Sequence, residues 1–403
     1  MQKVIQKLAV LYLVIWSISP PLEIDLIYRL LALGCAGLWF LFSLGRGLEV
    51  EHIHLWAAFF MAMVILIIFI QKWSVSNFIK QIPIYILVVC FIMNCFYRQG
   101  RWGELKEIVP IVMALLIIFN WNTARALLED PTIARRLVRA DESVYHYLRQ
   151  GIGGYSLIYP QVCISPALFA WTVHAFKRNK VFFLLGCGWA VSYTMCIFNA
   201  GYSIAIFTTI VGIIMLFAYR GKGIWKAILI SGSIFAGVLL AIIYLDGFRN
   251  YLLYTFDGTA VATKINDLVA TSSSGAAEGS IQARLIAYQA SLEMMWEYPV
   301  IGSLWRGSGG GHSAVLDMLA KYGIWGGAIY MSMLYYVPTD YKKTVPNPYI
   351  NRISNAVLVV MLFVTLLDSV TYSFMCMVLL VLPLLYEDIM MWKGIERCES
   401  CGP

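Results

Sequence analysis

Charged residues are scarce in this chain of 403 residues. Asp, Glu, Lys and Arg together account for 13% of the sequence, whereas hydrophobic residues account for 60%. A soluble globular domain is nearer half apolar and a quarter charged. This balance excludes a soluble domain and predicts an all-α polytopic membrane protein, because the apolar runs suit helices rather than barrel strands. We expect a single transmembrane domain over residues 1–403, since neither an internal repeat nor a second folded domain is visible.

Motifs that bind nucleotides and metals are missing as well. The sequence has no P-loop, no dinucleotide-binding glycine pattern and no zinc-protease helix. The nine cysteines lie mostly in apolar runs and indicate no disulfide framework. Cys398 and Cys401 have the C-x-x-C spacing, but a zinc site needs four ligands and there is no second pair. We therefore expect no cofactor and no metal.

Apolar runs of transmembrane length recur along the chain. A bilayer requires a helix of about 20 residues, and we predict twelve spans. The N-terminus is basic and then apolar, like a signal peptide, but it has no small-residue cleavage site and is interpreted as an uncleaved first span. The twelve runs lie near residues 4–18, 24–44, 55–71, 80–97, 107–121, 156–176, 181–199, 202–219, 226–244, 313–335, 353–370 and 372–391.

Basic residues in the short connections predict the orientation of these spans. With the N-terminus inside, Lys3, Lys177, Lys342 and Lys393 are among many basic residues on the inner side. The positive-inside rule then places both termini in the cytoplasm. Much of the net charge of +7 lies in these connections, so it does not imply nucleic acid as a partner.

This orientation leaves two longer loops on the outer face, residues 122–155 and 245–312. They favour arginine over lysine, and a guanidinium suits planar, bidentate binding of phosphate or carboxylate. Solvated faces and contacts with lipid headgroups explain such arginines equally well. The basic residues of the two loops are Arg125, Arg135, Arg136, Arg139, Arg149, Arg249, Lys264, Arg284 and Arg306.

The end of the second loop contains the residues best suited to chemistry. A predicted helix from Ser280 carries Arg284 and stops at Pro299. The glycine cluster Gly307–Gly311 follows; it lacks the Lys-Ser/Thr of a phosphate-binding loop, and we expect it to supply flexibility or close approach to a ligand. His312 then begins a long apolar helix. A flexible approach, a histidine and the start of a helix form a plausible site for an anionic substrate.

His312 is the best catalytic candidate of the five histidines, with His146 of the first outer loop second. Further along the same helix, Ser313, Asp317 and Lys321 form a polar stripe at helical spacing. Ionisable residues within a span face a bundle interior or a wet cavity. The stripe is therefore interpreted either as a structural ion pair between Asp317 and Lys321 or as the lining of a catalytic cavity.

Residues 284–327 resemble the C-terminal signature of the O-antigen polymerase and ligase superfamily (Wzy/WaaL). An arginine, Arg284, precedes a Pro-(Ile/Val)-x-Gly element at Pro299–Gly302. His312-Ser313 follows as His-(Ser/Asn), and Leu319–Gly326 matches Leu-x-x-Tyr-Gly-x-x-Gly. His-Ser and the residues after it are more similar to the polymerases (Wzy) than to the ligases.

The resemblance implies a GT-C-type glycosyltransferase that uses neither a metal nor a nucleotide sugar. Such a polymerase joins undecaprenyl-pyrophosphate-linked oligosaccharide repeat units into O-antigen or capsule polysaccharide, with inversion, at the outer leaflet of the bacterial inner membrane. Membrane lipid and a chain-length regulator protein are the implied partners. Its catalytic residues would be His312 and Arg284, and its pyrophosphate or substrate ligands would be Arg149, Arg139, Arg135, Arg136, Arg306, Tyr202 and Asp317.

One position departs from the family pattern. Where the family often has Ser-Arg-Gly at the outer start of a middle span, this sequence has Tyr202 in the place of the arginine. Another cation is then required to bind phosphate, and Arg149 or Arg139 is the expected substitute.

Two alternatives remain open. A ligase would use the same donor but transfer the glycan to lipid A-core. A polysaccharide transporter or flippase would show inverted repeats and helices interrupted near the midplane, and the sequence shows neither.

Overall fold

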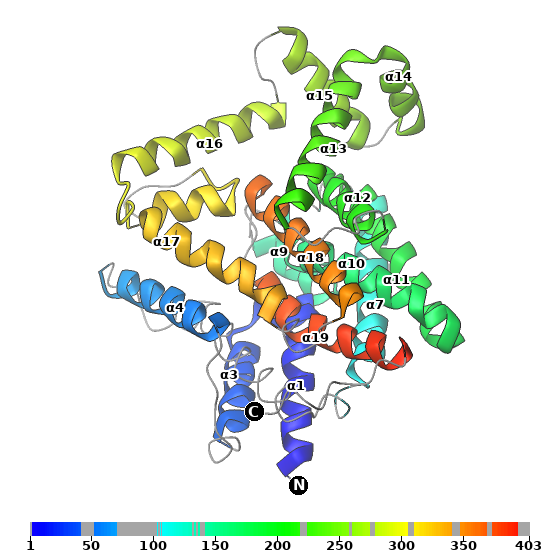
Figure 1. Ribbon diagram of the computed structural model, residues 1–403, viewed down its shortest axis with the longest axis vertical. Coiled ribbons are helices and arrows are strands. Elements are labelled where there is room, and N and C mark those ends of the chain that lie inside the picture. Colours follow the sequence, from blue (N-terminus) through cyan, green and yellow to red (C-terminus); the bar gives the residue numbers. More distant parts are fainter. Residues whose placement is uncertain are drawn as a thin grey trace.

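The computed structural model describes residues 2–41, 52–70, 103, 105, 107–130, 133, 136–137, 142–217, 224–257, 260–274, 279–304, 310–340, 347–368 and 373–393. These residues form helices and contain no strand (Figure 1). The first half comprises α1 (Gln2–Ile18), α2 (Pro20–Ile24), α3 (Leu26–Leu41), α4 (His52–Ile70), α7 (Ile108–Glu129), α9 (Glu142–Arg149), α10 (Tyr155–Arg178) and α11 (Lys180–Asn199). The second comprises α12 (Ser203–Phe217), α13 (Ile224–Tyr244), α14 (Asp246–Thr255), α15 (Ala260–Ser274), α16 (Gly279–Glu297), α17 (Ala314–Thr339), α18 (Pro348–Leu367) and α19 (Ser373–Lys393).

Helix α10 is the central element of the bundle. It packs against α11, α12, α18 and α19, and every residue from Leu157 to Thr172 except Phe169 is buried. A helix that is covered on all sides needs partners for its polar side chains, because an unpaired polar group in an apolar interior costs several kcal/mol. Ser165 and Thr172 donate to carbonyls of α10 itself. Trp171 and Gln161 instead find partners on neighbouring helices.

Gln161 is the clearest example. Its amide exchanges two hydrogen bonds of 2.8 Å with Asn120 of α7, and its oxygen also accepts from Trp189 Nε1 of α11 at 3.0 Å. All three side chains are fully buried. Hydrogen bonds of this kind link helices where the hydrophobic effect alone does not, so this network fixes the register of α7, α10 and α11.

Glycines allow close approach between the same helices. A Cβ added to Gly186 of α11 would lie 2.4 Å from Thr172 Oγ1 of α10. A Cβ on Gly212 of α12 would lie 2.9 Å from both Pro166 and Val360. Small residues of this kind let helix backbones pack tightly in a membrane bundle.

Within the described ranges, four helices are long and apolar enough to cross a membrane: α7, α10, α11 and α18. A fifth is possible if α13 and α14, which meet at a bend of 94°, form one broken span. Eleven of the twelve predicted runs coincide with helices, and the run at 80–97 lies outside the described residues. The described part of the chain is thus all-helical and consistent with a membrane protein, while the number of twelve spans stays a prediction.

Both predicted outer loops contain helices. Helix α7 continues to Glu129 and α9 ends at Arg149, while α14, α15 and α16 lie within 245–312. Residues 270–274 form the last turn of α15, although their side chains are small and mostly polar. Alanine, threonine and serine residues do not break a helix. Residues 275–278 lie outside the described part of the chain.

We expect Gly186→Ala to lower the thermal stability of the detergent-solubilised protein by about 1–3 kcal/mol, because its methyl group must displace buried Thr172. Gly237→Ala in α13 is the matched control, since a Cβ there meets nothing within 4 Å and alanine is the better helix former. The stability of each variant is measured as the temperature at which half of the monodisperse protein is lost. Equal stability of the two variants would contradict the packing of α10 on α11.

Candidate functional site

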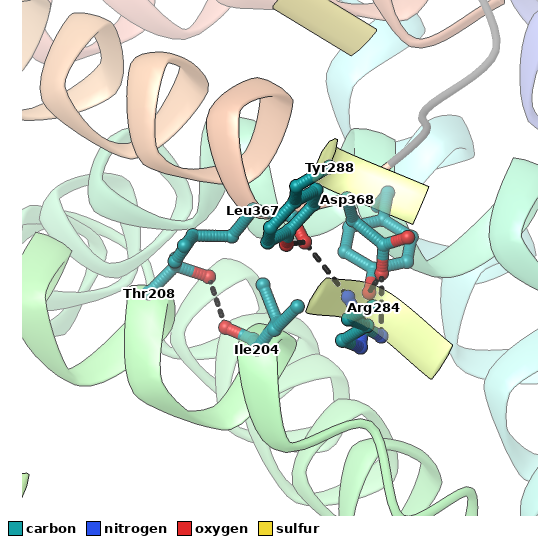
Figure 2. Close-up of polar contacts among 7 residues, drawn as sticks. Ile204, Thr208, Arg284, Tyr288, Leu367 and Asp368 are labelled. Atoms are coloured by element: carbon teal, nitrogen blue, oxygen red, sulfur yellow. Dashed lines mark hydrogen bonds and ion pairs between the residues drawn. The ribbon is translucent and has the colours of Figure 1, made fainter. Parts of the chain in front are cut away.

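The C-terminal end of α18 collects side chains from other helices. Leu367 is its last residue, and a carbonyl at this position has no partner within the helix. Arg284 Nη1 donates to the Leu367 carbonyl at 2.7 Å, and the Tyr288 hydroxyl donates to the same oxygen at 2.9 Å. Figure 2 shows both side chains of α16 directed at Leu367 and Asp368. A cation at this end of a helix is also favoured by the helix dipole.

Asp368 follows directly and is the centre of the cluster. Its Oδ2 accepts a hydrogen bond of 2.5 Å from the Tyr159 hydroxyl and lies 3.7 Å from Arg284 Nη2. The Asp368 side chain is 3% exposed and that of Arg284 is 28% exposed, so the ion pair is largely removed from water. Burial alone lowers the pKa of Arg284, but the Asp368 carboxylate and the hydrogen bond with Tyr288 raise it more, and the guanidinium stays charged.

Three tyrosines surround this carboxylate on the side of α10 and α12. The ring of Tyr155 meets those of Tyr159 and Tyr202 edge to face, each at 4.9 Å between centroids. Tyr159 and Tyr202 stack at 6.1 Å. Tyr202, which replaces the arginine of the family pattern, therefore lies beside the Asp368 cluster and contributes ring contacts in place of a charge.

The backbone that follows His312 also contacts Asp368. Helix α17 begins at Ala314, two residues later than predicted, and Ser313 is its N-cap, accepting a hydrogen bond of 3.2 Å from the Leu316 amide. The Ala314 amide donates to the Asp368 carbonyl at 3.0 Å. The backbone two residues after His312 is thus hydrogen-bonded to Asp368, the residue that pairs with Arg284. The imidazole is half-buried and makes no hydrogen bond with another described residue.

Asp317 holds the glycine segment in front of His312. Its Oδ1 accepts from the Ser291 hydroxyl at 2.8 Å and from the Gly311 amide at 3.1 Å. Ser291 Oγ in turn accepts from the Gly310 amide at 2.9 Å. These two hydrogen bonds occupy Oδ1 of Asp317.

The Pro299–Gly302 element and the Tyr-Gly element dock on each other. Helix α17 is interrupted at Gly323, which has a φ of 68°. The Ser303 and Leu304 amides donate to the carbonyls of Ala320 and Lys321 at 2.9 and 3.0 Å, and the Ile324 amide donates to the Pro299 carbonyl at 2.9 Å. The turn after α16 therefore satisfies backbone groups that the interruption leaves free. The sequence gives no sign of this interruption, which the structure reveals at Gly323.

The other arginines predicted to bind substrate have no contact with the Asp368 cluster among the described residues. Three of the loop arginines pair with acids near them in sequence. Arg125 and Arg136 are exposed, which matches the interpretation as solvated faces, whereas Arg249 is half-buried. The pairs are Arg125–Glu129, Arg136–Asp130 and Arg249–Asp246.

Arg149 is exposed at the end of α9, and within the described residues it forms no hydrogen bond or ion pair with Arg284, Asp368 or Tyr202. His146, on the exposed side of the same helix, contacts Gln150 at 3.0 Å. Arg135, Arg139 and Arg306 lie outside the described residues.

Sequence reasoning missed Asp368 and Tyr159. The predicted run at 353–370 extended through Asp368 and treated it as part of the span. The signal was present, because an isolated acid in an apolar run marks a paired or functional position. Tyr159 carries no comparable signal, since tyrosine is common along this chain. Across the described residues, no group of three His, Cys, Asp or Glu side chains could hold a metal ion.

Gly323→Ala should destabilise the protein by about 2 kcal/mol or more, because alanine is strained at positive φ and its Cβ would lie 2.3 Å from the Val300 carbonyl oxygen. Gly311→Ala is the control for the strain alone, since Gly311 has a φ of 76° but a Cβ there meets nothing within 4 Å. Thermal denaturation in detergent compares the two. A Gly323 variant no less stable than the Gly311 variant would show that the turn does not dock on α17.

Comparison with other proteins assigns no family. No protein-family model matches the sequence, and no functionally characterised protein matches it significantly. The assignment of function therefore depends on the residues gathered at the end of α18, together with the resemblance of residues 284–327 to the polymerase signature.

Proposed function

We propose that this protein is a membrane glycosyltransferase that joins undecaprenyl-pyrophosphate-linked oligosaccharide repeat units into an O-antigen or capsule polysaccharide. It would have about twelve spans with GT-C-type architecture, and it would act at the outer leaflet of a bacterial inner membrane with both termini in the cytoplasm. One observation carries the proposal. Arg284 pairs with the Asp368 carboxylate, and the Ala314 amide near His312 donates to the Asp368 carbonyl. A cation and a candidate base, distant in sequence, thereby share one end of the bundle.

The guanidinium is suited to stabilise a diphosphate leaving group. It carries five N–H donors, and its contacts with Leu367 and Asp368 engage Nη1 and Nη2. Donors that remain can bind the oxygens of a lipid-linked diphosphate as negative charge develops on them. Preorganised charge of this kind contributes a large share of many rate enhancements when water is excluded.

The imidazole of His312 is suited to accept the proton of the acceptor hydroxyl. An acceptor hydroxyl oxygen attacks the anomeric carbon of the donor glycan, and the bond from that carbon to the diphosphate oxygen breaks. The electron pair of that bond leaves with the diphosphate, and the hydroxyl proton passes to His312. Attack in line with the leaving group inverts the anomeric carbon.

Asp368 and its neighbours would serve this reaction by holding the guanidinium in place. The carboxylate receives Tyr159 on one side and faces Arg284 on the other, so the orientation of the cation is fixed before substrate binds. Tyr202 lies next to this pair, where a sugar or phosphate would enter. Binding of the diphosphate by Arg149, Arg139, Arg135, Arg136 or Arg306 remains part of the proposal.

The function is tested by reconstituting the protein in nanodiscs with a synthetic lipid-linked repeat unit and separating the products by size. The wild type should give a ladder of glycans, whereas Arg284→Ala and His312→Ala should each reduce polymer formation by about 10²-fold or more. Tyr288→Phe is the matched control. It removes the second hydrogen bond to the Leu367 carbonyl but leaves the guanidinium, and it should retain most of the activity.

The products also separate the alternatives. Transfer to added lipid A-core without a ladder would identify a ligase. Movement of the lipid-linked glycan across the bilayer with no new glycosidic bond would identify a transporter. An unchanged ladder from the His312 variant would remove this residue from the role of base.

A further inference from the structure

The segment before His312 is held unusually close to α16. A Cβ on Gly310 would lie 1.8 Å from the Ala287 carbonyl oxygen, so only glycine fits at this position. The Gly310 and Gly311 amides are both used as donors, to Ser291 Oγ and to Asp317 Oδ1. Successive backbone amides of this segment are thus tied to two side chains that also bind each other.

His312 therefore lies between two fixed points of the backbone. On one side the Gly311 amide is held by Asp317, and on the other the Ala314 amide is held by the Asp368 carbonyl. Ser291 is 2% exposed and Asp317 is 3% exposed. Their hydrogen bonds are consequently shielded from competition with water, which makes them costly to break.

We propose that Ser291 and Asp317 are positioning residues, which hold the Gly310–Gly311 backbone and thereby fix the place from which the His312 imidazole acts. The anchoring stands on the hydrogen bonds themselves, whereas its catalytic purpose rests on the proposed polymerase function. Asp317 acts through the backbone, and its carboxylate does not touch substrate. An error of about 1 Å in the position of a catalytic group costs on the order of 10²-fold in rate.

The role of Asp317 can be separated from that of a substrate ligand by changing its charge alone. Both hydrogen bonds arrive at Oδ1. Asparagine keeps an acceptor oxygen there and loses the charge, whereas leucine loses the acceptor. Positioning therefore predicts that Asp317→Asn stays within a few-fold of the wild type. A carboxylate that binds substrate or moves a proton predicts that asparagine is as harmful as leucine.

The first arm of the experiment measures polymerisation rates in nanodiscs. Asp317→Leu should lose about 10²-fold in kcat with little change in KM, because the misplaced group acts in the transition state. Ser291→Ala should lower kcat in the same way but by less, because Asp317 still holds Gly311. Ser354→Ala is the matched control: this serine is also buried, and it donates to the Pro338 carbonyl at 2.7 Å, away from the Asp368 cluster. It should leave the rate unchanged.

The second arm measures hydrogen–deuterium exchange of the Gly310 and Gly311 amides and requires no activity. Both amides should be protected in the wild type and in Asp317→Asn. Gly311 should exchange faster in Asp317→Leu, and Gly310 should exchange faster in Ser291→Ala. Unchanged protection in both of these variants, or an asparagine variant as inactive as the leucine variant, would overturn the proposal.

The two arms also distinguish failure of the anchor from failure of the proposed function. A wild type that forms no polymer but shows the predicted exchange pattern would refute the polymerase and leave the anchor intact. If the leucine variant does not fold, the asparagine and Ser291 variants still decide the question.

Discussion

The carboxylate and carbonyl of Asp368 are the constraint on which the rest of the site depends. The side chain receives Tyr159 from α10 and faces Arg284 from α16, while the main chain receives the first amide of α17. A buried charge without partners is expensive, and a buried pair is retained where its geometry is needed. Helices α10, α16 and α17 are thereby held at the end of α18. The orientation of Arg284 and the start of α17 consequently both depend on Asp368.

The interruption of α17 also helps to position the site. Its first half carries Asp317 and follows His312, and its interruption at Gly323 is filled by the turn that ends α16. Glycines are required on both sides of this contact, because a Cβ on Gly302 would lie 2.3 Å from the Tyr322 amide nitrogen and Gly323 has an equally close neighbour. The motifs that look separate in the sequence are therefore the two surfaces of one backbone contact. Together they hold α16, which carries Arg284, against the first half of α17, which follows His312.

Much of this fold could be predicted from the sequence, because long apolar runs indicate membrane helices. The site could be predicted only in part. Arg284 and His312 stand out in the sequence as polar residues on either side of Pro299 and the glycine cluster. The Arg284 side chain pairs with Asp368, and the Ala314 amide, two residues after His312, donates to the Asp368 carbonyl. Asp368 could be recognised as an isolated acid in an apolar run, but its partners could not be predicted, since they come from α10, α16 and α17 and no local pattern shows which helix ends meet. The interruption of α17 was hidden for a similar reason: Gly323 resembles any helical glycine until the turn at Pro299 is placed against it.

The most direct measurement is an experimental structure of the protein in a nanodisc with a lipid-linked oligosaccharide bound. The account predicts that the diphosphate contacts the Arg284 guanidinium, and that an acceptor hydroxyl lies within hydrogen-bond distance of the His312 imidazole at the end of α18. A diphosphate bound at the opposite end of the bundle, beside Lys180 and Arg352, would contradict it. So would a bound substrate that leaves Arg284 and His312 packed only against protein and lipid.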